Sequence, residues 1–387
     1  MAQRKNNRRP PRAIKIVTIT AGSLLALAIA LLVVGIISCG VYWQEYLSYP
    51  FAEVPVQLPR DHAAHSDFKT EWWYYTGHLD GNDGGCYGFQ LTFFRIRTAN
   101  LWYKWLPVWW FLYPHLIAAH IAITDVTDQR FYSAESIQER TSGNAGAKED
   151  SYHVWLGNWF VLDTPAGHRL HAQDRHIGLD LILTPKKPPA LHGEGGYLWK
   201  GVDGIPSYYI SFTRMDAGGE IRIKEKTVNV TGQAWMDHEF TSFKPKHSTR
   251  GWDWFAIQLA SGYDVMLYQM HRTDGSVSTD CTGTLVDPEG NTSSIAKPSY
   301  RIEETSFWTS PRTGVTYPVR WTVLLTDVPA TLDVKALIPD QEMVMKDSKI
   351  SYWEGACTVT GPWAGSPVTG KAYVELTGYE EIMSEKF

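Results

Sequence analysis

Residues 87–95 read YGFQLTFFR, and this stretch decides the fold class. Its apolar residues Tyr87, Phe89, Leu91 and Phe93 fall on every second position, as they do on one face of a β-strand. Similar alternation recurs later in the chain, and runs rich in glycine, proline, aspartate and asparagine separate the alternating stretches. The body of the chain lacks a strong amphipathic helix pattern. The sequence therefore predicts an all-β protein of many short antiparallel strands, arranged as sandwiches or barrels.

The composition excludes two classes of protein. Of the 387 residues, 44% are hydrophobic and 20% are charged, which rules out global disorder. Residues 1–38 hold six basic and no acidic residues, so the rest of the chain carries 30 basic and 41 acidic residues, a formal charge of −11. Because an acidic body repels a phosphate backbone, we expect no nucleic-acid partner.

The first forty residues look like a targeting segment. Residues 16–38 contain no charge and follow a basic head, and this length can span a bilayer with the basic head on the cytoplasmic side. The sequence around Cys39 also resembles a bacterial lipobox, which would attach a lipid to Cys39. An uncleaved anchor and a lipoprotein signal both remain open. Both predict that residues 1–40 tether the body to the bacterial cell membrane, with the body facing the periplasm or the exterior.

The body is long for one all-β domain, since such domains usually have about 200–250 residues. The alternation breaks at residues 243–250, FKPKHSTR, and we place a seam there. We therefore predict an N-terminal domain at 55–243 and a C-terminal domain at 244–387, after the membrane anchor or signal at 1–40.

Neither the cysteines nor the histidines form a recognisable metal site. The body contains only Cys86, Cys281 and Cys357, whose spacing gives no disulfide framework and no zinc–thiolate motif, and whether any two of them pair stays open. His62 and His65 are close in sequence but come without a complete ligand set. Signature motifs of common hydrolases, zinc proteases and dinucleotide-binding proteins are absent. We predict no metal and no cofactor.

The strongest catalytic candidate is His238, in the stretch AWMDHEF at 234–240. In a strand, Asp237 and Glu239 would point to one side and His238 to the other. A histidine in an apolar cavity has a tunable pKa and can act as an acid or a base near neutral pH. The alternative is a buried histidine bonded to a backbone carbonyl.

Two glutamates also lie among aromatic residues. Glu71 opens EWWYYTGHL at 71–79, where burial would give a carboxylic acid with a raised pKa. The alternative is a glutamate at a strand end, paired with Arg95 or Arg97. Glu354 has similar neighbours in YWEGAC, the stretch that begins at Tyr352.

Several predicted strands place aromatic and polar residues on the same face. Trp252, Trp254 and Gln258 would share one side of a strand, and Tyr373 and Glu375 would share one side of another. A barrel that encloses a ligand uses aromatic walls with a few polar groups. The alternative is a tryptophan-rich core whose N–H groups find local partners.

These blocks resemble, in the same order, the carotenoid 1,2-hydratase (CrtC) and AttH-like superfamily. The resemblance covers about residues 68 to 380 and is carried by 71–79, 87–95, 119–125 (AHIAITD), 208–215 (YYISFTRM), 232–239 (GQAWMDHE), 251–255 (GWDWF), 352–357 (YWEGAC) and 373–379 (YVELTGY). It implies two consecutive lipocalin-like antiparallel β-barrel domains, the first of the CrtC N-terminal type. It also implies a hydrophobic pocket at or near their junction.

Members of this superfamily hydrate acyclic carotenoids or prenylated phenols, or catalyse pericyclic reactions. Many others are membrane-anchored proteins called predicted secreted hydrolases, some encoded beside ABC transporters, and the chain is most similar to these. The hydratases carry Asn-Trp where this chain has Glu239 and Phe240. They also use an acidic residue in a later strand, where this chain offers Tyr268 and Gln269.

Two functions follow from these observations. In the first, the protein is an enzyme that acts on an apolar substrate such as an isoprenoid or a lipid-like molecule, by hydration or by a related, hydrolase-like reaction. For hydration, Asp237 or Glu71 would be the acid and His238 the base that orients water. In the second, it is a non-catalytic carrier, or an accessory protein of an ABC-type export system. Both need a hydrophobic small molecule as the partner. The residues predicted to contact it are Trp72, Tyr74, Gln90, Trp235, Trp252, Trp254, Tyr268 and Glu354.

Overall fold

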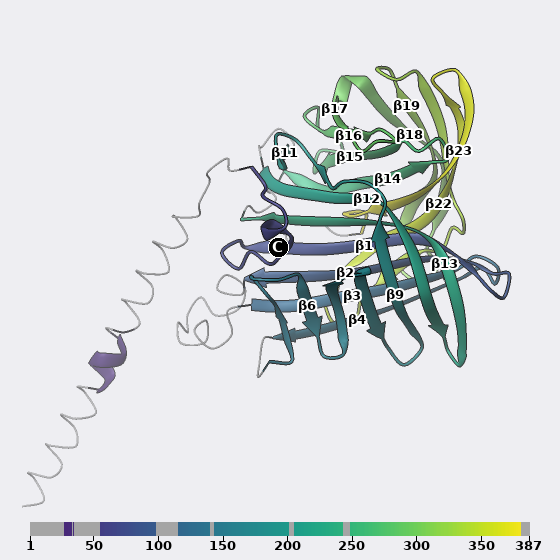
Figure 1. Ribbon diagram of the computed structural model, residues 1–387. Coiled ribbons are helices and arrows are strands. Elements are labelled where there is room, and N and C mark those ends of the chain that lie inside the picture. Colours follow the sequence, from purple (N-terminus) through teal and green to yellow (C-terminus); the bar gives the residue numbers. More distant parts are fainter. Residues whose placement is uncertain are drawn as a thin grey trace, which may run out of the picture. The chain divides into compact units, whose positions relative to one another are not determined.

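Strands make up most of the regular structure of the described residues and helices contribute very little, so the predicted all-β fold class is confirmed (Figure 1). The computed structural model describes residues 27–32, 34, 55–97, 115–139, 143–200, 205–242 and 248–380. Two short 3-10 helices, η1 (Arg60–His62) and η3 (Lys297–Ser299), interrupt the strands. The strands form two barrel-like antiparallel sheets, and both sheets belong to one compact unit of the chain.

The first sheet has 13 strands in the order β4-β3-β2-β1-β13-β12-β9-β8-β7-β6-β5, with β10 and β11 added beside β12. Strands β3 and β4 contact β6 and β9, which are distant in this order, so the sheet curls onto itself. Its strands are β1 (Thr70–Gly81), β2 (Cys86–Arg97), β3 (His115–Asp125), β4 (Arg130–Glu139), β5 (Ala145–Ala147), β6 (His153–Leu156), β7 (Trp159–Thr164), β8 (Gly167–Gln173), β9 (Ile177–Pro185), β10 (Ala190–Leu191), β11 (Tyr197–Lys200), β12 (Ile205–Ile223) and β13 (Lys226–Thr241).

The second sheet has 10 strands in the order β17-β16-β15-β14-β23-β22-β20-β19-β18, with β21 added beside β22. Its strands are β14 (Thr249–Leu259), β15 (Asp264–Arg272), β16 (Thr282–Val286), β17 (Thr292–Ala296), β18 (Tyr300–Thr309), β19 (Thr316–Leu325), β20 (Ala330–Ala336), β21 (Glu342–Val344), β22 (Ser351–Trp363) and β23 (Ser366–Leu376).

The two sheets touch along a line of neighbouring strands. Strand β1 contacts β23, β2 contacts β22, and β12 contacts β14. Gly88 permits the close approach of β2 to β22, because a Cβ atom at this position would lie 2.6 Å from the Cβ of Ala356. One hydrophobic cluster lies inside the first sheet and includes Trp73. A second cluster continues from the second sheet onto Tyr74 and Trp235 of the first, so the surface between the sheets is itself a core.

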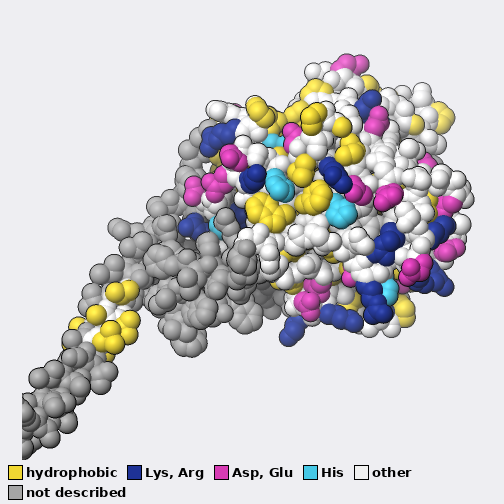
Figure 2. All heavy atoms as spheres, turned by 60° about the horizontal axis from the view of Figure 1, so that its bottom comes forward, with side chains coloured by type: hydrophobic (Ala, Val, Ile, Leu, Met, Phe, Trp, Pro, Cys, Tyr) yellow, Lys and Arg dark blue, Asp and Glu magenta, His cyan; other side chains and the backbone are white. Residues whose placement is uncertain are grey.

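The predicted targeting segment falls almost entirely outside the described residues. Of it, residues 27–32 and 34 are helical, and their exposed apolar side chains form the hydrophobic group on the narrow segment in Figure 2. Among the described residues, no helix has the length and the apolar character needed to cross a membrane. The rest of the predicted span at 16–38, and Cys39, lie outside the described part of the chain.

Candidate functional site

The candidate residues of β1 and β13 fall on two opposite faces of the first sheet. The two strands pair antiparallel, with Trp73 opposite His238 and Tyr74 opposite Asp237. Because side chains alternate between faces, Glu71 and His238 point into the interior enclosed by the curled first sheet, whereas Asp237 points outward toward the second sheet. The structure therefore brings Glu71 and His238 together and separates both from Asp237.

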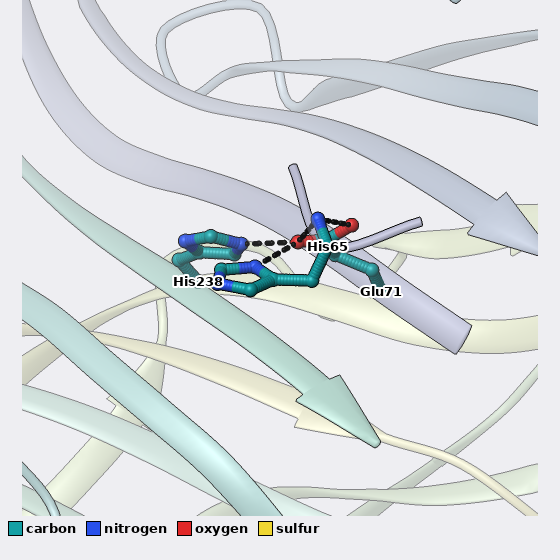
Figure 3. Close-up of side chains that lie close together, drawn as sticks. All are labelled: His65, Glu71 and His238. Carbon is teal, nitrogen blue, oxygen red and sulfur yellow. Dashed lines mark hydrogen bonds and ion pairs between the residues drawn. The ribbon is translucent and has the colours of Figure 1, made fainter. Parts of the chain in front are cut away.

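Inside the first sheet, the Glu71 carboxylate is the centre of a hydrogen-bonded cluster (Figure 3). Its Oε1 atom lies 2.8 Å from Nε2 of His238 and 2.9 Å from Nδ1 of His65, and its Oε2 atom accepts from Nε of Arg95 at 2.8 Å. Burial alone would raise the pKa of Glu71, but Arg95, His238 and His65 hold it well below its usual value. The expectation of a raised pKa was therefore wrong, and the pairing with Arg95 that we considered as the alternative is confirmed.

A second layer of groups fixes this cluster. Nε2 of His65 lies 3.3 Å from Asp61, and although burial opposes it, bonding to Asp61 and Glu71 raises the pKa of His65. The Arg95 guanidinium also donates to the carbonyl oxygens of His65 and Phe68 at 2.6 and 3.0 Å. Arg95 and His65, whose pKa is raised, supply positive charge beside the Asp61 and Glu71 carboxylates, so the interior of the first sheet holds a compensated ionic network.

The same groups match the ligand types of a divalent metal ion. The donor atoms of His65, Glu71 and His238 lie within 4.8 Å of one another, and two histidines with one carboxylate can bind zinc or iron. Both histidines are already bonded to Glu71, however, and Arg95 places a positive charge 2.8 Å from Glu71. A metal would have to displace these bonds beside a like charge, so the geometry favours the ionic network.

His238 is held as a neutral imidazole. Burial is the largest cause that lowers its pKa, and its ring stacks on Trp73 with the ring centres 5.1 Å apart. The ionised Glu71 accepts from Nε2, and Nδ1 has no hydrogen-bond partner among the described residues. The backbone-carbonyl bond considered for this histidine is therefore replaced by a carboxylate bond.

On the opposite face, Asp237 lies between the two sheets as a buried acid. It accepts from Oη of Tyr209 at 2.5 Å, from Nε1 of Trp235 at 2.6 Å, and from Oγ of Ser211. Burial outweighs these three donors and, with the nearby Glu239, raises the pKa of Asp237 to about 7. Near neutral pH, the Asp237 carboxyl group is therefore protonated in a substantial fraction of the molecules.

Two further carboxyl groups reach the same region from the second sheet. Tyr74 donates to Glu354 at 2.6 Å across the boundary between the sheets, and burial raises the pKa of Glu354 well above its usual value. Trp252 donates to Glu375 at 2.9 Å, and burial raises the pKa of Glu375 to about 7 despite this bond. In contrast to the network around Glu71, Lys200 is the one cation among the described residues whose charge lowers the pKa of any of these acids, and it acts on Glu375.

Aromatic rings surround these acids. Trp254 meets Tyr74 edge to face with ring centres 5.2 Å apart, meets Trp235 at 6.2 Å, and donates from Nε1 to Tyr209 at 2.8 Å. Lys200 bonds to Glu239 and stands over the rings of Tyr209, Trp72 and Tyr268 at 4.9, 5.8 and 5.7 Å. This face therefore combines a proton donor with several π-faces that favour positive charge.

The predicted ligand-contacting residues all lie on the faces that meet here. Cross-strand register and contacts place them together: Trp72, Tyr74, Gln90, Trp235, Trp252, Trp254, Tyr268 and Glu354. Three further residues of this region were not predicted from the sequence: Tyr209, Ser211 and Lys200. Tyr209 and Ser211 lie within a stretch that carried the family resemblance, which is the one signal that pointed to them.

Comparisons with known proteins match almost the whole chain. A family model described as AttH-like matches residues 49–379. An AttH protein from Nitrosomonas europaea has a similar structure with a TM-score of 0.76 and 30% sequence identity, covering 86% of this chain and 100% of that one. Kievitone hydratase from Nectria haematococca has a similar fold with a TM-score of 0.67 at 14% identity, covering 87% of this chain and 95% of that one. No curated protein sequence matches the chain.

Proposed function

The chain belongs to the AttH-like family, and we propose that it binds a hydrophobic, alkene-containing molecule between its two sheets and hydrates it with Asp237 as the acid. The observation that carries this proposal is the position of the Asp237 carboxyl group, which is buried between the sheets among tryptophan and tyrosine rings. Burial there raises the pKa of Asp237 to about 7, which suits a proton donor. The fold shared with kievitone hydratase, a protein whose name states a hydration, supports the same reaction class.

The proposed reaction starts with protonation of a trisubstituted double bond. Asp237 gives its proton to the less substituted carbon, the π-electrons form the new C–H bond, and the other carbon becomes a tertiary cation. Nearby aromatic faces stabilise this cation, at about 0.5–2 kcal/mol for each ring. Water then adds its lone pair to form the C–O bond, and its surplus proton returns to the Asp237 carboxylate, so that the net change is the addition of one water molecule.

The position of His238 alters the mechanism that the sequence suggested. Asp237 and His238 are adjacent in the chain but lie on opposite faces of β13, and His238 is bonded to Glu71 inside the first sheet. In this proposal Asp237 donates its proton between the two sheets. Glu71 and His238, on the opposite face of β13, only keep that strand in position.

The test is product formation by the purified full chain. Lycopene and a prenylated phenol are incubated with the protein, and mass spectrometry is used to detect products heavier by one water molecule. Asp237→Asn should abolish the product while ligand binding, followed by tryptophan fluorescence, is retained. Asp216→Asn, at an exposed acid of β12 paired with Lys186, is the control and should leave turnover unchanged.

Full turnover by Asp237→Asn would refute the assignment of the acid. Binding of the panel without any product from the unmodified protein would instead favour the carrier, because a carrier needs the apolar surface but no proton donor.

A further inference from the structure

Three buried polar atoms between the sheets have no hydrogen-bond partner among the described residues. They are Oγ1 of Thr76, Oε1 of Gln90 and Oη of Tyr373. The three residues are 1%, 0% and 2% exposed, so bulk solvent does not reach them. Buried polar groups in folded proteins are almost always hydrogen-bonded, and three such atoms without a protein partner point to a bound molecule that supplies the missing bonds.

The three residues lie on neighbouring strands where the two sheets meet. Thr76 and Gln90 are directly opposite each other in the pairing of β1 with β2, so their side chains share a face and are neighbours. Tyr373 approaches from β23, with its ring centre 6.5 Å from that of His78, the next residue after Thr76 on this face of β1. Ala356, the cross-strand neighbour of Tyr373, packs against Gly88, which is two positions from Gln90.

The hydrogen-bonding capacity of these three atoms indicates which functional group of a ligand could bind them. Oε1 of Gln90 is an amide oxygen and can only accept a hydrogen bond, while the amide nitrogen of the same side chain donates to Thr92. The hydroxyls of Thr76 and Tyr373 can each donate. A carbonyl group would leave Gln90 without a donor, and a carboxylate would in addition stand close to Glu354, which interacts electrostatically with Tyr373. A hydroxyl group both donates and accepts, so it satisfies the set.

We propose that the hydrophobic ligand carries a hydroxyl group, which Gln90, Thr76 and Tyr373 recognise between the sheets. This inference rests on the proposed function and narrows its substrate to isoprenoid-like alcohols. Thr76 follows Tyr74, the pairing partner of Asp237, by two positions on the same face, a separation of roughly 7 Å along the strand. The hydroxyl group and the reacting double bond are therefore only a few bonds apart in the ligand.

The experiment compares the binding of farnesol with that of the matching hydrocarbon that lacks its hydroxyl group. Both are titrated into the full chain, and the quenching of tryptophan fluorescence is measured. The unmodified protein should bind farnesol ~10- to 100-fold more tightly, because the hydrocarbon leaves buried polar atoms unpaired. Gln90→Leu should remove most of this preference while leaving the affinity for the hydrocarbon unchanged or higher.

Two further variants keep the result interpretable. Tyr373→Phe removes a single hydroxyl group at nearly constant shape and should reduce the preference by about 10-fold if Gln90→Leu fails to fold. Thr124→Val is the matched control, because Thr124 is equally buried between the sheets but donates to Gln341 at 2.8 Å, and it should leave the preference unchanged.

The outcomes separate this inference from the proposed function. Equal affinity of the unmodified protein for the two compounds would overturn the hydroxyl site and leave hydrophobic binding standing, with water as the partner of the three atoms. Binding of neither compound would overturn both. A preference that survives in both Gln90→Leu and Tyr373→Phe would also overturn the assignment of these residues.

Discussion

Replacing Asp237 with asparagine should change how the stability of the protein depends on pH. Asp237 is 3% exposed, and its pKa is raised from 3.8 to about 7 in the folded chain. Between these two values, the folded state keeps a proton that the unfolded state has lost. The free energy of unfolding therefore falls as pH rises through this window, and it levels off above pH 7.

The size of the effect follows from the same two values. Each pKa unit corresponds to about 1.4 kcal/mol, so the displacement of the Asp237 pKa corresponds to about 4 kcal/mol between acid and alkaline conditions. Asparagine occupies nearly the same volume but does not titrate. Asp237→Asn should therefore gain about 4 kcal/mol relative to the unmodified protein as pH rises from about 4 to about 8.

Urea unfolding at a series of pH values measures this difference directly. The quantity to compare is the free energy of unfolding of Asp237→Asn minus that of the unmodified protein, because the other titrating groups are present in both. The charge of Asp237 also raises the pKa of Glu375, so this smaller coupling remains in the difference. Any change in hydrogen bonding with Tyr209, Ser211 and Trp235 adds an offset that depends little on pH. A difference that stays constant across the whole range would refute the view of Asp237 as a buried acid and, with it, the proposed proton donor.

Three other results are expected. His238→Gln should lower turnover per folded molecule by at most about 10-fold, whereas Asp237→Asn should lower it by at least ~100-fold, because only Asp237→Asn removes the proton donor. A product assay in which His238→Gln has the larger effect would instead indicate that the reaction takes place in the interior of the first sheet. Arg95→Met should lower the free energy of unfolding by about 3–5 kcal/mol, because the buried Glu71 would lose the cation that contributes most to keeping it ionised and would retain only its bonds to His65 and His238. The loss should be about 2 kcal/mol smaller in a Glu71→Gln background; equal losses in the two backgrounds, measured in urea, would disprove the coupling. A farnesol analogue with a tertiary ammonium group at the cationic carbon should bind about 10-fold more tightly than its uncharged isostere in fluorescence titrations, because it resembles the cation; weaker binding would argue against a cationic intermediate.

The fold could be predicted because the information for it is local. Alternation along 87–95 places Phe89, Leu91 and Phe93 inside the first sheet, where each is fully buried. The same periodicity places Asp237 and His238 on opposite sides of one strand. Which distant groups face each side of this strand depends on how the strands pair, and the sequence of a single strand does not determine its partners.

The errors at the site have this origin. The pKa of Glu71 was expected to be raised, because its sequence neighbours are aromatic, whereas its ionisation is decided by Arg95 on β2 and by His238 on β13. His65 was considered only with His62 as an incomplete metal-ligand pair, and its bond to Glu71 was not predicted, because it reaches Glu71 from the loop after η1 and not from a strand. Lys200 was missed for a similar reason, since its contact with Glu239 joins β11 to β13, which are not paired with each other.

The contrast between the two acidic clusters is the strongest physical argument for placing the function between the sheets. A buried carboxylate is tolerated when cations and donors surround it, and Glu71 meets this condition with Arg95 and His65. Asp237 and Glu354 are buried just as deeply, yet the protein leaves them close to neutrality, where each costs stability once it loses its proton. Apolar residues of similar size would pack this boundary without that cost. A purely structural core therefore has no need of protonated acids among aromatic rings, whereas a site for proton transfer requires them.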